Sequence, residues 1–253
     1  MLKCFFVVYS KEQIKNIQKS GEILAYTLNK AVKAVKNGIS AKELDELAEK
    51  IIRDKKAEPA FKGYDGFPAS LCVSINENIV HGVPTKNAIL KQGDVVGLDL
   101  GVKYNGYFAD MAVTIAVGKI SSQAKKMIQV TKKALDLGIK QAKTGNTIGD
   151  IGKAIQTYVE KNKFSVIRQL TGHGVGKKIH EDPKIPNFIP SSWENIKLQE
   201  GMVLAIEPMV AMGDFKIKTL SDGWTVAMAD KSLSAHFEHT IVVTKKGGKI
   251  LTK

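Results

Sequence analysis

The sequence predicts an α+β domain made of two similar halves, each with two helices followed by a strand that leads to a carboxylate. Residues 36–52 align with residues 143–159 at an offset of 107, and both segments contain a turn and a capped helix. Glycine turns then introduce two apolar runs, residues 95–99 and 203–207, at an offset of 108. We therefore expect a pseudo-twofold domain with halves at about 10–118 and 119–245 and a site between them.

The first half begins with two amphipathic helices. Ser10 followed by Gln13 is a capping-box pattern, and apolar residues recur at helical spacing until a stop at Asn37-Gly38. Ser40 with Glu43 forms a second capping box before another amphipathic segment, which extends to residue 52. Together these patterns predict a helical hairpin over residues 10–52.

The second half repeats the arrangement. Residues 124–142 have the spacing of a long helix that ends before Thr144-Gly145. Thr147 and Asp150 then cap a helix that runs towards Val159. Capped helix pairs are common, so the repeat depends on the strands that follow each pair at the same offset.

Asn105-Gly106, between two apolar-rich runs, predicts a β-hairpin with a two-residue type I′ turn. In that register Gly101 lies opposite Asp110. Side chains alternate between the faces of a strand, so Asp99 shares a face with Gly101, and Asp110 joins it there. We therefore expect Asp99 and Asp110 to be diagonal neighbours, roughly 5 to 8 Å apart.

Four carboxylates are candidates for a site. Asp99 and Asp110 would repel each other on a half-buried face, so they need a proton, a base or a metal as compensation. A single strand Asp is more often a turn cap at the surface, but the pair favours a site. Glu207 follows an apolar run, where an ionised Glu is costly unless it is ligated or paired. Glu238 precedes the strand-like residues 241–243, and a water-facing edge position is its alternative.

His173 lies in a glycine-rich segment, residues 171–176, that superficially resembles a phosphate-binding loop. The Gly-Lys-Ser/Thr ending of such a loop is missing, which disfavours a nucleotide site. A lone histidine there is more often a structural turn residue. A histidine beside four carboxylates suits a transition-metal site with oxygen and nitrogen donors. Two of the carboxylates, Asp110 and Glu238, can bridge two ions, as in two-metal hydrolases.

Composition limits the remaining classes of function. Thirty-eight Lys and Arg against 25 Asp and Glu give a net charge of +13, which suits contact with RNA or another polyanion. Lysines that keep helices soluble explain the charge equally well, and no motif for sequence-specific nucleic-acid binding is present. No apolar run is long enough for a membrane span, and the run from Cys4 to Tyr9 is too short for a signal peptide. Cys4 and Cys72 form no paired spacing, so we expect a cytoplasmic protein.

Several longer segments then carry a family resemblance. They are residues 63–68 (GYDGFP), 72–77 (CVSINE), 81–84 (HGVP), 173–176 (HGVG) with His180-Glu181, 206–209 (IEPM), 222–225 (DGWT) and 232–240 (SLSAHFEHT). Over nearly the whole chain the sequence resembles type I methionine aminopeptidases. The resemblance implies the pita-bread fold, in which helices cover a curved, mainly antiparallel sheet.

The resemblance also implies the residues of the site. By it, two divalent metal ions (Co, Mn, Fe or Zn) are bound by five ligands, of which Asp110 and Glu238 bridge the ions. Two further histidines match residues that position substrate and stabilise the tetrahedral intermediate without binding metal, and a set of mainly aromatic residues matches the methionine pocket. The implied ligands are Asp99, Asp110, His173, Glu207 and Glu238; the implied histidines are His81 and His180; the implied pocket residues are Tyr64, Phe67, Cys72, His81, His180 and Trp224.

Four positions depart from the usual pattern of the family. Phe67 replaces a frequent Tyr, Phe61 a frequent Cys, Ile179 a frequent aromatic residue, and Met111 a small polar residue. We expect these four residues to alter the shape of the pocket and to leave metal binding intact.

The implied reaction is removal of the N-terminal methionine from nascent proteins, preferably before a small second residue. A metal-bridging water or hydroxide attacks the first peptide bond, with His81, His180 and Glu207 as catalytic residues and Glu207 as proton shuttle. We expect a monomer, a single catalytic domain over residues 1–253 without an N-terminal extension, and transient ribosome contact through the basic surface.

Two alternatives compete with this interpretation. A catalytically silent relative would bind RNA or protein, but such relatives lose ligands, and this chain keeps all five. A proline-directed peptidase of the same fold usually carries a large N-terminal domain, for which 253 residues leave no room.

Overall fold

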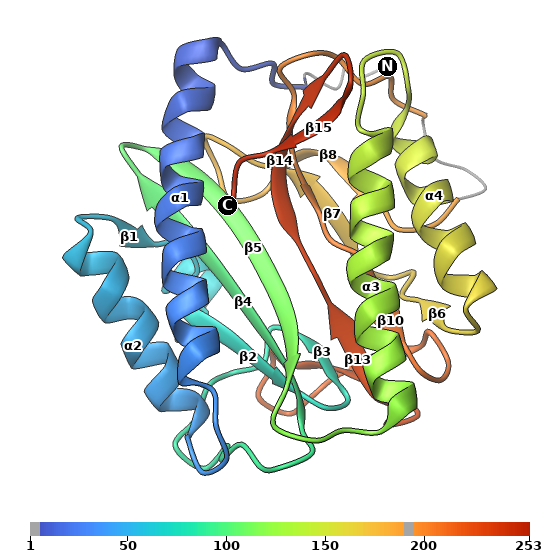
Figure 1. Ribbon diagram of the computed structural model, residues 1–253. Helices are drawn as coiled ribbons and strands as arrows, with labels where there is room; N and C mark the ends of the chain where they lie inside the picture. The colour runs from blue at the N-terminus through green and yellow to red at the C-terminus, as the bar shows by residue number, and fades with distance from the viewer. Residues whose placement is uncertain (1–5, 190–194) are drawn as a thin grey trace.

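The computed structural model describes residues 6–189 and 195–253, so Cys4 and the start of the apolar run before Tyr9 lie outside the described residues. Four long helices lie on one side of a set of antiparallel strands (Figure 1). Helices α1 (Lys11–Ala34) and α2 (Ala41–Asp54) cover the strands of the first half. Helices α3 (Ser122–Gln141) and α4 (Ile148–Lys161) cover those of the second half. The predicted α+β architecture, with helices covering a mainly antiparallel sheet, is confirmed.

Helices α1 (Lys11–Ala34) and α2 (Ala41–Asp54) begin at the two capping boxes that the sequence predicts. The N–H of Gln13 donates to Ser10 Oγ at 3.3 Å, and the Ser10 N–H donates to Gln13 Oε1 at 2.9 Å. Ser40 and Glu43 make the same reciprocal pair at the start of α2. Each cap satisfies orphan donors of the first helical turn and contributes about 1 kcal/mol to helix stability.

Helix α1 ends three residues before the predicted stop. Val35 already has extended backbone, with ψ at 122°. The chain turns there because the Gly38 N–H donates to Leu90 O at 2.8 Å and the Leu90 N–H donates to Ile39 O at 2.9 Å. These long-range bonds override the local helical pattern of residues 35–37.

Helices α3 (Ser122–Gln141) and α4 (Ile148–Lys161) repeat this arrangement in the second half. The Thr147 and Asp150 capping box that the sequence predicts is present at the start of α4. Helix α3 begins two residues earlier than expected because the Ser121 hydroxyl accepts from the Ala124 N–H at 3.1 Å.

The first sheet contains the predicted hairpin. Tyr104 pairs with Tyr107 and Gly101 with Asp110, as the turn at Asn105-Gly106 requires, and both turn residues have positive φ. Strand β4 continues past Asp99 to the turn, whereas β9 ends at Ile206, directly before Glu207. The sheet has the order β1-β4-β2, with β5 also on β4. Its strands are β1 (Glu58–Pro59), β2 (Leu71–Ile75), β4 (Val95–Tyr104) and β5 (Tyr107–Ala116).

The other strands form a five-stranded sheet, β15-β14-β9-β7-β8, and two three-stranded sheets, β13-β10-β6 and β11-β12-β3, all antiparallel. Several of these strands are only two to four residues long, and a short 3₁₀ turn, η1 (Tyr64–Gly66), precedes β2. The bounds are β3 (Asn78–Val80), β6 (Ser165–Val166), β7 (Thr171–Gly174), β8 (Glu181–Pro186), β9 (Val203–Ile206), β10 (Met209–Ala211), β11 (Ile217–Thr219), β12 (Val226–Met228), β13 (Ser234–His236), β14 (His239–Thr244) and β15 (Gly247–Ile250).

Each half has its own hydrophobic core between helices and strands. Leu24 and Leu44 of the two N-terminal helices pack with Leu98 of β4 in the first core. Met127 and Ile155 of α3 and α4 pack with Ile241 of β14 in the second. A fully buried aliphatic side chain contributes about 1.5 to 3 kcal/mol, so these cores stabilise the helix-facing side of the strands. The opposite side carries buried carboxylates beside a smaller apolar cluster that includes Phe61 and Phe67.

A ladder joins β5 of the first half to residues 236–240 of the second. The Thr114 hydroxyl donates to His236 O at 2.7 Å and accepts from the His236 N–H at 2.9 Å. The Glu238 N–H donates to Ala112 O at 2.9 Å. Farther along, Asp110 pairs with the Thr240 hydroxyl. This ladder places Asp110 and Glu238 next to each other at the boundary between the halves.

Candidate metal centre

One cavity of about 820 Å³ is lined by every residue that the sequence places in the site. The cavity opens on the side of the strands away from the two helical cores, and three lysines lie among its lining residues. The predicted site residues that line it are Tyr64, Phe67, Cys72, His81, Asp99, Asp110, His173, His180, Glu207, Trp224 and Glu238. The structure thus brings together side chains that are far apart in the sequence.

Strands β4 and β5 position the two aspartates. Asp99 pairs with Ala112 and Gly101 with Asp110, so the two carboxylates share one face as diagonal neighbours. Both side chains are buried, while the alternating residues Leu98 and Leu100 belong to the helix-facing core. The alternation of the strand therefore directs the carboxylates into the cavity.

The two glutamates come from the second half of the chain. Glu207 follows the last residue of β9, and Glu238 lies directly before β14. These strands pair with His239 opposite Ile206, which brings the two glutamates close together. Both glutamates are buried.

His173 lies on β7, beside β9. Its Nδ1 is 2.9 Å from Gly174 O, and this contact favours the tautomer with the proton on Nδ1. Nε2 then presents a lone pair to the carboxylates, at 3.5 Å from Glu207 Oε1 and 3.9 Å from Asp110 Oδ2. This orientation is the one that a metal-binding imidazole needs.

The described residues contain three groups of potential ligands, and within each group the ligand atoms lie within 4.8 Å of one another. They are Asp99, Asp110 and Glu238; His173, Glu207 and Glu238; and Asp110, His173 and His180. Asp110, His173 and Glu238 each belong to two groups, and of these three only the carboxylates have two oxygens with which to contact two ions. Among the described residues, Asp99 Oδ1 and Glu238 Oε1 are buried without a hydrogen-bond partner. Unpaired buried carboxylate oxygens beside an imidazole fit divalent transition metals.

Burial without a cation changes the pKa of each acid in the site. Desolvation, with repulsion from Glu207, raises the pKa of Asp99 to about 7. The pKa values of Asp110, Glu207 and Glu238 are also raised, chiefly by burial. Burial lowers the pKa of His173 to about 3, so this imidazole is neutral at pH 7. The carboxylates of the site are therefore stable only when they are protonated or bind a cation.

His81 and His180 lie at the edge of the carboxylate group. His180 Nδ1 is 3.0 Å from the Tyr64 hydroxyl, and the rings of His180 and His173 have centroids 4.4 Å apart. Burial lowers the pKa of both His81, to about 4, and His180. His180 is near enough to Asp110 and His173 to be a ligand, so geometry alone leaves both of its roles open.

Phe67 and Trp224 form an aromatic wall of the cavity, in an edge-to-face contact with centroids 5.3 Å apart. Cys72 is buried beside them, and its burial raises the pKa of the thiol. Phe61 lines the same cavity, and Ile179 packs behind it in the same cluster. These residues shape an apolar recess next to the carboxylates.

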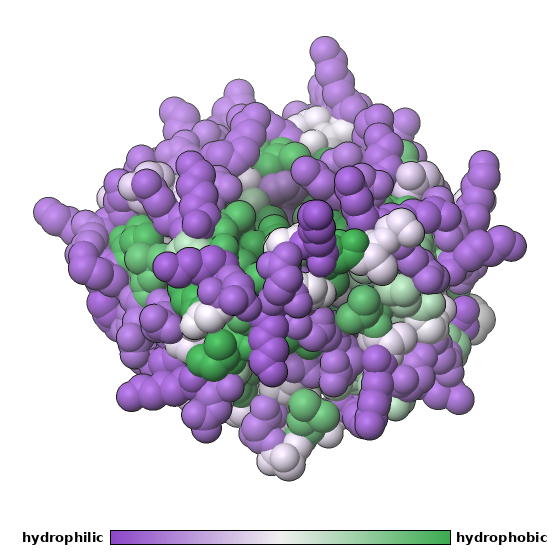
Figure 2. Space-filling model, turned by 60° about the horizontal axis from the view of Figure 1, so that its bottom comes forward, coloured by the Kyte–Doolittle hydropathy of each residue, from purple (hydrophilic) through white to green (hydrophobic). Residues whose placement is uncertain are grey.

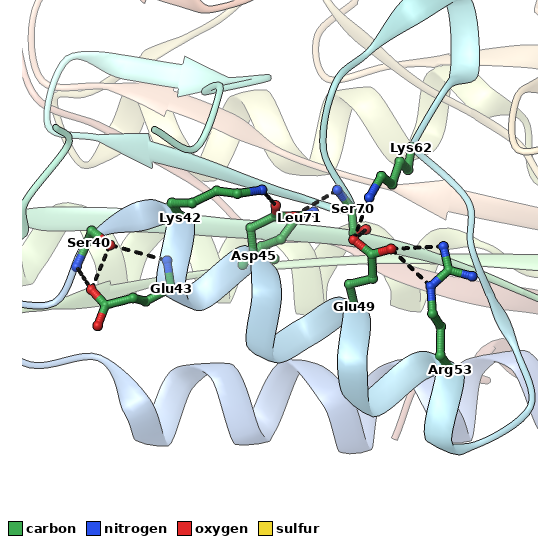
Figure 3. A network of polar contacts seen from close by, with 9 residues as sticks. All are labelled: Ser40, Lys42, Glu43, Asp45, Glu49, Arg53, Lys62, Ser70 and Leu71. Carbon is green, nitrogen blue, oxygen red and sulfur yellow. Dashed lines mark hydrogen bonds and ion pairs between the residues drawn. The ribbon is translucent and has the colours of Figure 1, made fainter. Parts of the chain in front are cut away.

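Carboxylates of α2 anchor the loop that carries Tyr64 and Phe67 (Figure 3). Asp45 Oδ1 accepts from the Ser70 N–H at 2.8 Å and the Leu71 N–H at 3.0 Å. Glu49 Oε2 binds Lys62 Nζ at 2.7 Å and accepts from the Ser70 hydroxyl at 3.2 Å. Both ends of the loop are thus attached to one helix.

Two features differ from the sequence interpretation. Met111 does not shape the pocket, because its side chain packs in the core under α1 and α2 while its neighbour Asp110 faces the cavity. His236 was missed. It is buried, with Nε2 3.3 Å from Glu207 Oε2. Its only signal in the sequence is its place two residues before Glu238, which puts both on one face of an extended segment.

Comparison with known proteins finds similarity to methionine aminopeptidases over nearly the whole chain. A methionine aminopeptidase from Bacillus subtilis is 49% identical over 237 residues, which are 94% of this chain and 95% of that protein. The crystal structure of methionine aminopeptidase from Thermotoga maritima matches with a TM-score of 0.95 at 41% identity, covering 98% of this chain and all of that one.

The fold extends to a second group of peptidases. Prolidase from Pyrococcus furiosus matches with a TM-score of 0.80 at 26% identity, over 98% of this chain and 65% of that one. Residues 15–245 match the model of metallopeptidase family M24. The chain therefore belongs to metallopeptidase family M24, and its fold is the pita-bread fold of the methionine aminopeptidases and prolidases.

Proposed function

We propose that this chain is a metal-dependent aminopeptidase that removes the N-terminal methionine from nascent proteins, preferably when the second residue is small. The observation that carries this proposal is the convergence of four buried carboxylates and His173 on one cavity with an aromatic recess. The similarity to methionine aminopeptidases over nearly the whole chain supports it.

Five residues would hold the cofactor, which we propose to be two divalent ions of Co, Mn, Fe or Zn. Asp99 would complete one set of ligands and His173 with Glu207 the other, and Asp110 and Glu238 would be shared by both. When bound, such ions lower the pKa of water and polarise a peptide carbonyl. They also neutralise carboxylates that otherwise repel one another in a buried space.

Side chains of the cavity would do the rest of the catalysis. Glu207 accepts a proton from the attacking water and passes it to the leaving amine. His81 and His180 donate hydrogen bonds to the oxygen that becomes negative in the tetrahedral intermediate. Tyr64, Phe67, Cys72 and Trp224 surround the methionine thioether, which packs favourably against aromatic rings.

Metal removal and substrate choice test the proposal together. The metal-free protein should not cleave Met-Ala peptides, and Mn²⁺, Co²⁺ or Fe²⁺ should restore cleavage. Acetylation of the peptide amine should abolish cleavage. Full activity of demonstrably metal-free protein, or faster cleavage of X-Pro peptides than of Met-Ala peptides, would refute it. Inactivity in every metal would instead favour a binding protein.

The excess of basic residues concerns where the protein would meet nascent chains. Figure 2 shows a face over which long hydrophilic side chains project, with smaller hydrophobic areas between them. The net charge of the whole chain, +13, suits transient contact with ribosomal RNA, where nascent chains emerge. Co-sedimentation with ribosomes should occur at low salt and weaken as salt is added. Charge reversal of surface lysines should reduce it, and an unchanged result would contradict the contact.

Further parts of the proposal concern the whole chain. We propose one catalytic domain, with halves at about 10–118 and 119–245, that acts as a monomer in the cytoplasm. In the described ranges no helix combines the length and apolarity that a bilayer crossing requires. Sedimentation of the purified protein tests the monomer.

A further inference from the structure

His236 occupies a fixed position beside the metal centre. It is 3% exposed and ends strand β13. Its backbone N–H and C=O are both bound by the Thr114 hydroxyl, at 2.9 and 2.7 Å, and it pairs with Met209 of β10. Strands on both sides thus hold the backbone, so the direction of the imidazole is set by the fold.

The imidazole faces one oxygen of a proposed ligand. His236 Nε2 is 3.3 Å from Glu207 Oε2, while His173 Nε2 is 3.5 Å from the other oxygen, Glu207 Oε1. The carboxylate of Glu207 therefore lies between two imidazoles. His236 Nε2 is buried and has no aligned hydrogen-bond partner in the described part of the chain.

A buried N–H without a partner loses its hydrogen bonds to water, so a small reorientation that pairs Nε2 with Oε2 is favourable. We propose that His236 is a positioning residue: its Nε2–H donates to Glu207 Oε2 and holds Oε1 towards His173 and Asp110. This inference rests on the proposed role of Glu207 as a ligand. It adds a residue that acts through Glu207 and touches neither metal nor substrate.

The expected consequence is a change in metal affinity. A carboxylate held at one oxygen cannot rotate freely, so less conformational freedom is lost when the other oxygen binds a cation. Loss of such a partner behind a metal ligand typically weakens metal affinity 10- to 100-fold. A residue that only fills space would not depend on having an N–H group.

The experiment compares two substitutions of one site. His236→Phe keeps a planar ring without a donor, and His236→Gln keeps an N–H group of similar reach. Calorimetry with Mn²⁺ on the metal-free proteins should show affinity about 10- to 100-fold weaker for His236→Phe. His236→Gln should keep most of the affinity. At saturating Mn²⁺, His236→Phe should lower kcat for a Met-Ala peptide and leave KM nearly unchanged.

His239 provides the matched control. It lies three residues after His236, outside the cavity, and its Nδ1 is 2.8 Å from Thr252 Oγ1. His239→Phe removes a half-buried imidazole close to His236 in sequence and should leave Mn²⁺ affinity unchanged. Equal losses for His236→Phe and His236→Gln would show that packing alone matters and would overturn the inference. Unchanged affinity in both would do the same.

A measurement on the unaltered protein covers the case in which His236→Phe does not fold. Nitrogen NMR of the labelled imidazole should show the proton on Nε2 when diamagnetic Zn²⁺ is bound, and a bare Nε2 would overturn the inference. Mn²⁺ binding and Met-Ala cleavage by the unaltered protein report on the proposed function separately.

Discussion

The Asp110 N–H donates to the Thr240 hydroxyl, and that hydroxyl donates back to Asp110 O, both at 2.8 Å. The two residues are 130 positions apart and belong to different halves of the molecule. Both are buried, so water cannot replace either bond. The side chain of one half thus fixes the backbone of a proposed bridging ligand in the other.

Thr240→Val should therefore weaken both the fold and the metal centre. The methyl group leaves the Asp110 N–H and C=O without a partner, which costs about 1 to 3 kcal/mol in the free energy of unfolding. Urea denaturation and Mn²⁺ calorimetry measure the two effects. Thr240→Ser keeps the hydroxyl, so its Mn²⁺ affinity should be close to that of the unaltered protein. Thr244→Val, which removes the hydroxyl that donates to Gly247 O in the nearby turn, should leave it unchanged.

The three cavity histidines should separate into two classes. His173→Ala should lose metal and activity together, because its Nε2 faces two carboxylates. His180→Ala and His81→Ala should keep their metal and lose about 10²-fold or more in kcat, the usual effect of removing a donor to a developing oxyanion. Metal content of the purified variants, read beside kcat, decides the matter. A metal-depleted His180→Ala would make His180 a ligand.

Removing one carboxylate should stabilise the metal-free protein. Asp99 is buried beside other acids, and Asp99→Asn removes a charge that costs free energy there. Without metal at pH 8, we expect a gain of about 1 kcal/mol in the free energy of unfolding.

With Mn²⁺ at a hundred times its dissociation constant, the unaltered protein should be more stable than Asp99→Asn, because bound metal stabilises the unaltered protein by about 2.7 kcal/mol. Thermal denaturation with and without Mn²⁺ measures both cases. Asp54→Asn, in an exposed ion pair with Lys50, serves as control. Greater stability of the unaltered protein without metal would contradict the argument.

The contacts of Glu49 with the pocket loop predict that the free energy of unfolding depends on pH (Figure 3). Lys62, with Arg53 and Ser70, lowers the pKa of Glu49 to about 2. A lowered pKa stabilises the fold above the unfolded value, about 4.3, and this stabilisation is lost as pH falls from about 5 towards 2.

Glu49→Gln should therefore cost about 1 kcal/mol at pH 7, a modest amount because Lys62 is 44% exposed and the pair is screened. The difference should shrink towards pH 2. Urea denaturation across this range measures it. The exposed Glu46 on the same helix makes no ion pair within the described residues, so Glu46→Gln should change nothing. A difference that persists at pH 2 would exclude the charge as its cause.

The parts of the fold that the sequence predicts well are set by neighbouring residues. Asn105-Gly106 determines the register of the hairpin, and the register alone puts Asp99 and Asp110 on one face. The capping boxes at Ser10 and Ser40 likewise act within one helical turn. Such short-range rules need no knowledge of the rest of the chain.

The parts that escaped prediction depend on distant partners. Strands such as β7 and β13 are too short to show a pattern, and they exist because β9 and β10 lie beside them. The sequence does not distinguish His236 from an ordinary core histidine, because only the fold shows that His236 lies close to Glu207. Met111 was misjudged because its nearness in sequence to Asp110 says nothing about which face it occupies.

The ladder between β5 and residues 236–240 also orders events during synthesis of the chain. Asp99 and Asp110 are made early, but the other three proposed ligands all come from residue 173 onward. A growing chain that has not yet made Glu238 and Thr240 has two exposed carboxylates and nothing to close over them. The proposed site is therefore complete only after residues 238–240 have been made and have paired with β5.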